Sequence, residues 1–503
     1  MKIESIERVR SHRRLGLGIA AGTATLVLLT AAVVVIKATT GQQTTSSAKG
    51  EITSANVGQL QLDWKADLGG AAAGHYKEGV YAPIVSGDRV FEATTPGAIY
   101  SYPVDCASDG ASCQGTLFAQ TEGSIGQPLV LADGTIYVTT GAGKLYAFPA
   151  DCPAPCSPSW VGSTVTGPRA IDCGPRKPPN CFPASEFIAP PLVSDGMVLG
   201  DTSEGTFYAF PTDCDAGQGT TIGAVCEPAW TARLNGTPYA PVAFEGVVYA
   251  SNGWDRIYAF DVHTGRKLWI AEPTRPVSHH GLLLAIQGGV IATTFGTDTL
   301  DAFPLDCVPS GGRCAAAWTG RLPDPLGATP AGGEGIMLAT SFCSWTCSSV
   351  TAFSPDCATG GAACEPLWTA HLPECCTNPT VHDGKVFVTG DCSGPRCPSV
   401  TVIEAFDPQC GTGGAACDPL WRAPESDGGL FHVFVNDLLF VGTRRGGVLA
   451  FGTDCRTDGG MCKPAWSFTG ASTAVSSPAA AGGRLFVASD DGTLYAFGLS
   501  SNG

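Results

Sequence analysis

Short apolar segments separated by tight turns recur along the chain from Trp64 to Phe497. A typical unit has an apolar segment, a turn such as Asp133-Gly134, and then a segment such as residues 135–139 in which apolar and polar residues alternate. Asp-Gly turns between segments of period two are typical of β-hairpins. The pattern therefore predicts many short antiparallel strands rather than packed helices.

A short motif marks the third strand of each predicted repeat. It is an aromatic or apolar residue followed by Ala-Phe or a close variant. The motifs end at Tyr102, Phe148, Phe210, Phe260, Phe303, Phe353, Phe406, Phe451 and Phe497. From residue 102 to residue 497 there are eight intervals of about 49 residues each, which is the length of one four-stranded propeller blade.

One large aromatic residue follows or precedes each motif at the position of a fourth strand. These residues are Trp64, Phe118, Trp160, Trp230, Trp269, Trp318, Trp368, Trp421 and Trp466. A single one would fit an isolated core position, but nine in phase predict a side chain that docks between adjacent blades. Trp64 precedes the first full repeat, and the last repeat stops after its third strand. We therefore expect the Trp64 strand to complete the last blade and close the ring.

The segment from Ala259 to Trp269 resembles a known repeat. It reads Ala-Phe-Asp-Val-His-Thr-Gly-Arg-Lys-Leu-Trp and is similar to the pyrroloquinoline-quinone (PQQ) repeat, A-x-D-x-x-T-G-x-x-x-W. The resemblance implies that Trp269 docks on the neighbouring blade and that Asp261 and Thr264 cap the turn that contains Gly265. The other copies keep Ala-Phe and Trp but replace the Thr-Gly turn with a cysteine-bearing loop.

The resemblance covers most of residues 60–498 and implies an all-β propeller of the quinoprotein alcohol dehydrogenase-like superfamily. Eight four-stranded blades are usual in that family, whereas the markers here number nine, so we expect eight blades with nine as the alternative. The family includes dehydrogenases that use PQQ and Ca²⁺. It also includes non-enzymatic propellers that bind proteins, such as the outer-membrane assembly lipoprotein.

The N-terminal segment predicts a membrane anchor. Residues 15–36 contain no charge, and as a helix they would span roughly 33 Å, enough for the core of a bilayer. The basic residues before this stretch are Lys2, Arg8, Arg10, Arg13 and Arg14, which places the N-terminus in the cytoplasm. A cleaved signal peptide is the alternative, but its apolar region would be shorter.

These observations divide the chain into five parts. We expect a cytoplasmic segment at 1–14, a transmembrane signal-anchor helix at 15–36, a flexible linker at 37–57, the propeller at 58–498 and a short tail at 499–503. The protein would then be a single-pass protein of the cell membrane with an extracytoplasmic propeller. Its net charge of −16 repels phosphate backbones, so no nucleic-acid partner is expected.

The 22 cysteines predict disulfides, because their number is even and the propeller is expected to be exported. The candidate pairs are Cys106/Cys113, Cys152/Cys156, Cys173/Cys181, Cys214/Cys226, Cys307/Cys314, Cys343/Cys347, Cys357/Cys364, Cys392/Cys397, Cys410/Cys417 and Cys455/Cys462. Most would staple the hairpin between the third and fourth strands, each contributing roughly 2.5 kcal/mol for an eight-residue loop. Zinc is disfavoured because the spacings are long and the pairs lie in separate blades.

Cys375-Cys376 is the one vicinal pair that could belong to a cofactor site. Quinoprotein alcohol dehydrogenases have a vicinal disulfide at a similar point, stacked over PQQ, so the resemblance implies a cofactor contact here if PQQ binds. The stretch that follows, Thr377 to Pro379, departs from the family's Asn-Arg-Gly-like sequence. Adjacent cysteines pair only through a strained ring, so partners among Cys343, Cys347, Cys392 and Cys397 stay open.

Two functions follow from the sequence. The first is a non-catalytic extracytoplasmic scaffold that binds an envelope protein or a small ligand. The second is a PQQ- and Ca²⁺-dependent dehydrogenase that oxidises an alcohol or a sugar. Asp391 and Glu404 are candidates for a catalytic carboxylate by chemistry alone, since no recognisable set of catalytic residues or metal ligands surrounds them. We assign no catalytic residue and no metal site, and we favour the scaffold.

Overall fold

The computed structural model describes most of the chain between Gly50 and Leu499. The described residues are 50–68, 74–75, 79–164, 187–214, 224–236, 239–252, 255–272, 274, 284–293, 298–307, 312–323, 328–343, 347–357, 362–372, 379–389, 401–425, 429–443, 445–455, 461–473 and 475–499. They all belong to one compact unit, Val35–Gly503. Apart from the 3-10 turn η1 (Val57–Gln59), their regular structure is β.

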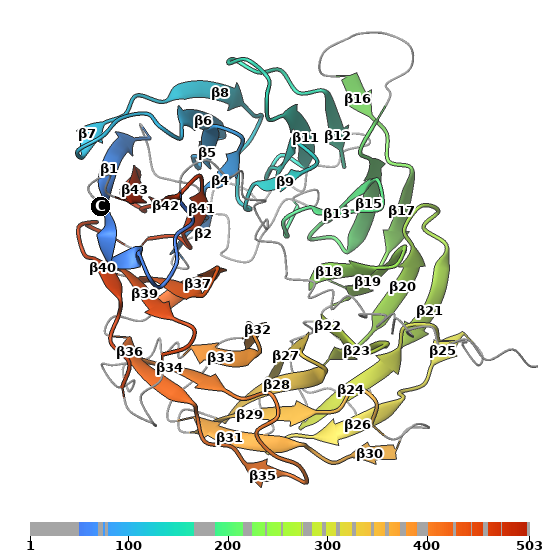
Figure 1. Ribbon diagram of the computed structural model, residues 1–503. Helices are drawn as coiled ribbons and strands as arrows, with labels where there is room; N and C mark the ends of the chain where they lie inside the picture. The colour runs from blue at the N-terminus through green and yellow to red at the C-terminus, as the bar shows by residue number, and fades with distance from the viewer. Residues whose placement is uncertain are drawn as a thin grey trace, which may run out of the picture. The chain divides into compact units, whose positions relative to one another are not determined.

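Nine antiparallel sheets follow one another in chain order, each with an inner, a second, a third and an outer strand (Figure 1). We number them blades 1 to 9. Their strands are, in blade 1, β4 (Ile84–Ser86), β5 (Arg89–Ala93), β6 (Ala98–Pro103) and β8 (Thr116–Gln120); in blade 2, β9 (Val130–Ala132), β10 (Thr135–Thr139), β11 (Lys144–Pro149) and β12 (Trp160–Ser163); in blade 3, β13 (Leu192–Ser194), β14 (Met197–Asp201), β15 (Thr206–Pro211) and β17 (Trp230–Arg233).

The middle of the ring repeats the same arrangement. Its strands are, in blade 4, β18 (Tyr239–Phe244), β19 (Val247–Ser251), β20 (Ile257–Asp261) and β21 (Lys267–Ala271); in blade 5, β22 (Leu284–Gln287), β23 (Val290–Thr293), β24 (Thr299–Pro304) and β26 (Trp318–Arg321); in blade 6, β27 (Ala328–Gly333), β28 (Ile336–Cys343), β29 (Cys347–Phe353) and β31 (Trp368–Leu372). Each marker motif lies on a third strand, as predicted.

The last three blades complete the ring. Their strands are, in blade 7, β32 (Thr380–His382), β33 (Lys385–Thr389), β34 (Thr401–Phe406) and β36 (Trp421–Glu425); in blade 8, β37 (Gly429–Val435), β38 (Leu438–Thr443), β39 (Val448–Gly452) and β40 (Trp466–Phe468); in blade 9, β41 (Ala479–Ala481), β42 (Arg484–Ala488), β43 (Thr493–Leu499) and β1 (Leu60–Asp67). A separate hairpin, β2 (Gly74–His75) with β3 (Gly79–Val80), precedes blade 1. The expectation of eight blades is therefore wrong, because all nine markers belong to complete four-stranded sheets.

The turns between inner and second strands have the geometry that their sequences predict. Asp133 and Gly134 have φ angles of 46° and 74°, and Asp383 and Gly384 have φ angles of 48° and 67°. Two successive residues in the left-handed region match the turn that suits a twisted two-residue hairpin. Asp and Gly tolerate this region better than most residues, which explains why they recur there.

The ends of the chain meet in blade 9. Strand β1 pairs antiparallel with β43 from Leu60↔Leu499 to Asp67↔Thr493, which confirms that the Trp64 strand completes the last blade. Arg484 on β42 donates from Nε to Asp63 Oδ2 at 2.8 Å, and its guanidinium also contacts Asp105, which follows β6 of blade 1. Closure thus joins the first and last segments both by a strand ladder and by a largely buried arginine.

Nine apolar clusters fill the nine seams between blades. In a typical seam the outer-strand Trp of one blade packs on the motif Phe of the next, as Trp318 does on Phe353 at 5.9 Å between ring centroids. Trp318 and Trp368 are fully buried. The motif Phe and the outer Trp therefore contact each other across the seam, not within one blade.

A hydrogen bond accompanies each docked indole. The Nε1–H groups of eight tryptophans donate to backbone carbonyls at 2.8–3.4 Å, in the pairs Trp64–Val104, Trp160–Thr212, Trp230–Val262, Trp269–Leu305, Trp318–Pro355, Trp368–Pro408, Trp421–Thr453 and Trp466–Leu60. In seven pairs the acceptor lies two residues after the motif's last aromatic ring. In the eighth, the acceptor is Leu60, which pairs with Leu499, the residue two positions after Phe497.

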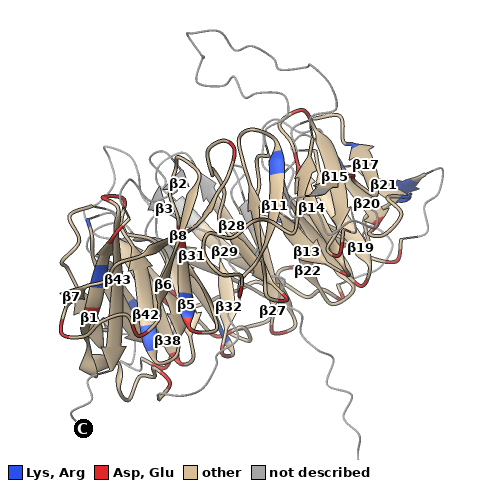
Figure 2. Cartoon of the chain, turned by 90° about the horizontal axis from the view of Figure 1, so that it is seen from above, with Lys and Arg blue, Asp and Glu red and all other residues tan. Residues whose placement is uncertain are grey.

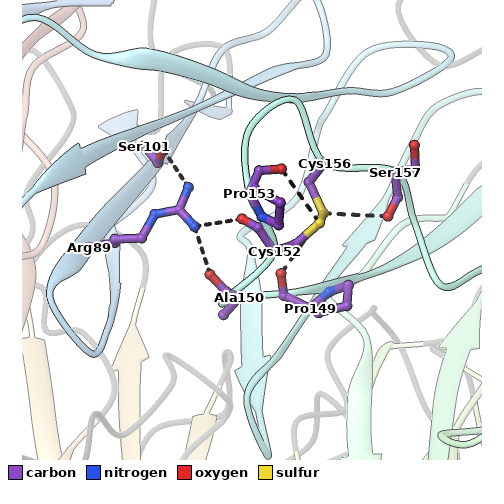
Figure 3. The surroundings of a disulfide bond; sticks show 8 residues. All are labelled: Arg89, Ser101, Pro149, Ala150, Cys152, Pro153, Cys156 and Ser157. Carbon is purple, nitrogen blue, oxygen red and sulfur yellow. Dashed lines mark hydrogen bonds between the residues drawn. A yellow bond between two sulfur atoms is a disulfide. The ribbon is translucent and has the colours of Figure 1, made fainter.

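The seam between blades 1 and 2 has Phe118 in place of Trp, and Phe118 has no N–H to donate. Arg89 of β5 supplies the missing donor (Figure 3). Its guanidinium carbon lies 4.9 Å from the centroid of the Phe118 ring, and Nη1 donates to the carbonyls of Ala150 (3.1 Å) and Cys152 (2.8 Å). Ala150 follows its motif Phe by two residues, so Arg89 reaches the same acceptor position that the indoles use elsewhere.

Seven of the candidate cysteine pairs form disulfides in the third-to-fourth-strand connections. They are Cys106–Cys113, Cys152–Cys156, Cys214–Cys226, Cys307–Cys314, Cys357–Cys364, Cys410–Cys417 and Cys455–Cys462. We call each disulfide-closed connection a strap. Every strap contacts the outer strand of the preceding blade, so the disulfides stabilise seams as well as their own hairpins.

Five straps add a short parallel fifth strand to the preceding blade. These strands are β7 (Ala111–Ser112) on β1, β16 (Ala224–Cys226) on β12, β25 (Arg313–Cys314) on β21, β30 (Ala362–Cys364) on β26 and β35 (Ala415–Ala416) on β31. In the other two straps Cys156 N–H donates to Phe118 O, and Met461 forms an isolated parallel bridge with Arg422, whose carbonyl accepts from Cys462 N–H. The straps thus cover the sheet edges that a propeller otherwise exposes at its rim.

The last residues of the predicted linker pack against blade 8. Ile52 and Val57 are buried in the cluster between blades 8 and 9. Asn436 Nδ2 donates to Ile52 O at 2.8 Å, and Ser54 N–H donates to Asp437 Oδ1 at 3.0 Å. Residues 52–57 therefore belong to the folded unit.

The predicted transmembrane helix, residues 15–36, lies outside the described residues. In the part of the chain that the structure describes, no helix has the length and apolar character needed to cross a membrane. The anchor stays a prediction from the sequence.

We expect Arg89→Met to lower the free energy of unfolding by about 2 kcal/mol, because hydrogen bonds from a charged donor contribute about 1.5–3 kcal/mol. Methionine keeps an apolar stem over Phe118 but removes every donor. Adding Phe118→Trp should restore part of the loss, since an indole supplies the donor at the other seams. Urea unfolding with the disulfides intact measures both effects.

Arg321→Met is the matched control, because Arg321 is exposed and lies 3.8 Å from Asp298. Exposed pairs of this kind contribute less than about 1 kcal/mol. Equal losses for the two arginine variants would show that Arg89 has no special role in its seam.

Candidate functional site

Cys375 and Cys376, the two cysteines proposed for a cofactor site, lie outside the described residues. So do the disulfide candidates Cys173, Cys181, Cys392 and Cys397 and the carboxylate candidate Asp391. Cys343 and Cys347 lie at the adjoining ends of β28 and β29 as Cα partners across the turn. The cofactor role and the pairing of the vicinal cysteines therefore stay predictions.

The one PQQ-type turn has the contacts that the resemblance implies. Asp261 Oδ1 accepts hydrogen bonds from Thr264 N–H (2.9 Å) and Oγ1–H (2.7 Å), and these bonds lower the pKa of Asp261. Gly265 has φ +64°, and a Cβ added there would lie 2.5 Å from the Trp230 ring. This turn therefore needs glycine both for its backbone angle and for its close approach to Trp230.

The inner strands form the wall that faces the centre of the ring (Figure 1). None of the nine inner strands contains Asp, Glu, Lys or Arg within its described bounds. Their polar side chains are hydroxyls, one amide and two imidazoles. The described inner wall is therefore formally uncharged when its histidines are neutral.

Both imidazoles of the inner wall lie where blades 7 and 8 meet. His432 Nε2 is 2.9 Å from Thr380 Oγ1, and His382 Nε2–H donates to the Asn436 carbonyl at 2.9 Å. The His382 ring stacks on Phe434 at 4.3 Å between centroids. The sequence analysis missed this cluster, because single histidines on two separate strands give no motif.

The first residue of the marker motif anchors the connection that enters its blade. Tyr258 Oη–H donates to Leu234 O at 2.8 Å, and Tyr146 Oη accepts from Glu122 N–H at 2.9 Å. In blade 5 this residue is Asp301, whose carboxylate accepts from Thr274 N–H at 3.0 Å and from its hydroxyl at 2.9 Å. The buried Asp301 carboxylate therefore has a structural partner.

Glu404 occupies the same motif position in blade 7, where its environment does not suit a catalytic base. It is 2% exposed, and its Oε1 accepts from Arg422 Nε at 2.5 Å. Burial raises the pKa of Glu404, and Arg422 opposes that shift. A carboxylate enclosed in this way cannot reach a substrate hydroxyl without opening the blade.

Two other buried carboxyls lack full hydrogen bonding. Among the described residues, both oxygens of Asp201 lack a hydrogen-bond partner, and so does Oε2 of Glu92. Burial raises the pKa of Asp201 to about 7 and the pKa of Glu92 well above its ordinary value. Side chains alternate along a strand, so Asp201 faces the same seam as Leu199, between blades 3 and 4. The Asp201 carboxyl therefore lies in a seam between blades and not on the inner wall.

One face of the ring carries the turns between inner and second strands, and these turns are acidic. The exposed residues there are Asp88, Asp133, Asp195, Glu245, Glu334 and Asp383. Figure 2 shows acidic residues at the turns below β27, β32 and β38. Carboxylates spread over one face give it a negative potential that repels anions.

Ca²⁺ and PQQ would need side chains that the described inner wall does not supply. Ca²⁺ takes six to eight oxygen ligands, usually including carboxylates. PQQ is a polycarboxylate and needs cationic groups or several hydrogen-bond donors. Among the described residues, no three His, Cys, Asp or Glu side chains are grouped so that they could hold a metal. The described residues therefore do not form a quinone site.

A family comparison identifies the repeat. Residues 399–501 match the family model of PQQ-like repeats described as outer membrane protein assembly factor BamB. The match covers the third and fourth strands of blade 7, all of blade 8 and the first three strands of blade 9. The nine four-stranded blades make the chain a β-propeller, and its residues 399–501 are similar to PQQ-like repeats. No curated protein gives a significant match.

Several solved structures resemble this chain at low identity. BamB from Moraxella catarrhalis is 15% identical over 88% of this chain and 99% of its own, with a TM-score of 0.46. Quinohemoprotein alcohol dehydrogenase from Comamonas testosteroni is 12% identical over 90% and 78%, with a TM-score of 0.48. Saccharomyces cerevisiae Sqt1 is 11% identical over 85% and 98%, with a TM-score of 0.47. The function of this chain has to be argued from its own residues.

Asp201→Asn should flatten the pH dependence of stability. Between about pH 4 and about pH 7 the Asp201 carboxyl is ionised in the unfolded chain and protonated in the fold, so its contribution to stability falls as pH rises. Above pH 7 the variant should gain up to about 4 kcal/mol, at 1.4 kcal/mol per pKa unit. Urea unfolding from pH 4 to 8 measures the slope.

Asp195→Asn is the control for this experiment, because Asp195 is exposed in the turn that precedes the same strand. It should keep the wild-type slope. If Asp201→Asn keeps that slope too, the Asp201 carboxyl is ionised in the fold and the assignment is wrong.

Proposed function

We propose that this protein is a non-catalytic scaffold that binds a partner protein or a small ligand. The observation that carries the proposal is that the described inner strands contain no Asp, Glu, Lys or Arg. The buried carboxyls that the structure describes, Glu92, Asp201, Asp301 and Glu404, lie on second and third strands. Asp301 and Glu404 have structural partners, and burial raises the pKa of Glu92 and Asp201. What the molecule offers to a partner is its exposed rim and turns.

The rigidity of the ring supports a binding role. Docked indoles and straps fix each blade against the next, so a partner would meet a preformed surface. A preformed surface loses little conformational freedom on association, which favours affinity. The family model that residues 399–501 match is described as outer membrane protein assembly factor BamB, which favours a protein as the partner.

We also propose an extracytoplasmic location with an N-terminal anchor. Seven disulfides suit an oxidising compartment. The uncharged stretch at residues 15–36 with basic residues before it supports a signal-anchor helix. The propeller would then be tethered to the outer side of the cell membrane.

Quinone titration separates the scaffold from the dehydrogenase. Full-length protein from an oxidising compartment, given PQQ and Ca²⁺, should show no stoichiometric quinone absorbance and no dye-linked oxidation of alcohols or sugars. The reason is the missing set of carboxylates and cations on the described inner wall. Saturable binding with turnover that is lost in Cys375→Ser/Cys376→Ser, and kept in the control Cys343→Ser/Cys347→Ser, would overturn the scaffold.

Alkaline carbonate extraction of cell membranes tests the anchor. We expect the full-length protein to stay in the membrane fraction, and a variant that lacks residues 15–36 to be lost from it. A transmembrane helix resists extraction because its apolar surface stays in lipid. N-terminal sequencing is the second readout, and a mature N-terminus near residue 40 would establish a cleaved signal peptide instead.

A further inference from the structure

The outer strand of blade 3, β17, has no strap. Straps cover the outer strands of blades 9, 1, 2, 4, 5, 6 and 7. The outer strand of blade 8, β40, is also the last strand of its described sheet, and Leu60 accepts the Trp466 hydrogen bond as Val262 accepts that of Trp230. The connection that would cover β17 is the PQQ-type turn at Thr264-Gly265, which has no cysteine. In the described sheet of blade 3, β17 is the last strand.

The other blades show which atoms of β17 face outward. The carbonyl of the residue after the outer-strand Trp accepts from the strap in three blades: Lys65 O from Cys113 N–H (2.8 Å), Thr369 O from Cys417 N–H (3.0 Å) and Arg422 O from Cys462 N–H (2.6 Å). The equivalent residue on β17 is Thr231. Its pairing with Tyr208 matches the pairing of Thr369 with Thr351. The outward backbone groups of Thr231 thus occupy the position that a strap uses elsewhere.

Exposure at the rim agrees with an uncovered edge. Trp230 is 8% exposed, whereas Trp318 and Trp368 are 0% exposed. Thr231 is exposed, while Thr319 and Thr369, its counterparts under straps, are half-buried. Gly265 covers the Trp230 ring without pairing with the strand. The indole of blade 3 is therefore docked, but no segment that the structure describes pairs with the outer edge of its strand.

The straps define the kind of segment that fits such an edge. All five strap strands run parallel to the strand they cover and contain only two or three residues. Four of them consist of small or apolar residues: Ala-Ser, Ala-Val-Cys, Ala-Ala-Cys and Ala-Ala. The four residues of β17 are thus long enough to receive an added strand. An extended segment rich in small residues matches the chemistry of these strands.

Charge around β17 defines the flanks of that segment. Arg233 on β17 is exposed, and so are Arg266 and Lys267, which directly follow the glycine packed on Trp230. Figure 2 shows basic residues beside β17 and β21. In a chain of net charge −16, this stretch of rim is locally cationic. Opposite charges at the edge of an interface speed association and select partners, so acidic flanks are favoured.

We propose that β17 is the docking edge for an extended segment of a partner protein. The segment has small residues at its centre and acidic residues at its ends, and it adds to blade 3 as a parallel fifth strand. The proposal rests on the scaffold function and names where a partner binds.

A synthetic peptide tests the edge. The probe is fluorescein-labelled Asp-Glu-Ala-Ala-Val-Ala-Asp-Glu, titrated with full-length protein and followed by fluorescence anisotropy. We expect saturable binding that weakens as salt rises. A peptide with Lys at the four acidic positions, and one with Pro in place of the second Ala, should bind at least about tenfold more weakly, because each loses cross-edge attraction or a main-chain hydrogen bond.

Two variants of the protein locate the binding. Thr231→Pro removes the outward N–H and should weaken binding about tenfold, while Thr231→Ala keeps that N–H and should bind as the wild type does. In the second variant, residues 306–317 of blade 5 replace residues 263–268, which gives blade 4 a strap of its own. This strap should cover β17 and abolish binding. Circular dichroism and the melting temperature check that both variants fold.

Each other result has a definite meaning. No saturable binding up to about 1 mM peptide overturns the proposal. If both Thr231→Pro and the strap graft bind the peptide as the wild type does, the peptide binds elsewhere on the protein. The proposal that β17 is the docking edge is then wrong, but the scaffold function is not affected. If Thr231→Ala weakens peptide binding as much as Thr231→Pro does, the peptide does not bind through the main-chain N–H of Thr231, and the proposed strand addition is wrong. Self-association that Thr231→Pro abolishes makes a second copy of this chain the occupant and overturns the partner assignment. Quinone turnover, by contrast, overturns the scaffold itself.

Discussion

The docking of one outer-strand aromatic residue on the next blade is the interaction on which this ring depends. The indole fills the seam against the motif Phe, and its N–H donates to a carbonyl two residues beyond that Phe, as Trp318 does to Pro355 at 2.9 Å. Packing gives the contact its apolar stabilisation, and the hydrogen bond fixes the register between blades. Where Phe118 replaces Trp, Arg89 supplies the donor from another strand. The seams thus share a hydrogen-bond donor that reaches this carbonyl, although the residue that provides the donor differs.

The straps follow from this arrangement. A docked blade still leaves its outer strand with unpaired backbone groups at the rim. The third-to-fourth-strand connection of the next blade passes beside that edge, and a disulfide such as Cys410–Cys417 closes it so that its second cysteine donates to Thr369 O. Stability and edge protection therefore come from the same loop. Blade 4 has the PQQ-type turn in place of a strap, so no strap covers β17 of blade 3.

The polar groups of the interior also serve the seams. Asp301 holds the connection at Thr274, Glu404 pairs with Arg422, and burial raises the pKa of Asp201 to about 7. A catalytic centre would need such groups to converge on one accessible point. Here they are spread around the ring and enclosed, while the described inner strands contain no Asp, Glu, Lys or Arg. Because the buried carboxyls lie in the seams and the described inner strands carry none, we propose that a partner binds at the rim and not at the centre of the ring.

Local periodicity was enough to determine much of this protein. The marker motifs, the nine aromatic residues and the position of Trp64 predicted four-stranded blades and their closure, because each signal lies within one repeat of about 49 residues. The sequence also predicted the seven strap disulfides, whose cysteines are at most 12 residues apart. It did not decide between eight and nine blades, because the resembled family usually has eight blades whereas the marker motif occurs nine times. Only the tertiary structure decided that number, the role of Arg89, the partner of Glu404 and the open edge of β17. Each of these depends on contacts between strands or blades, and a repeat pattern carries no information about which neighbour a side chain meets.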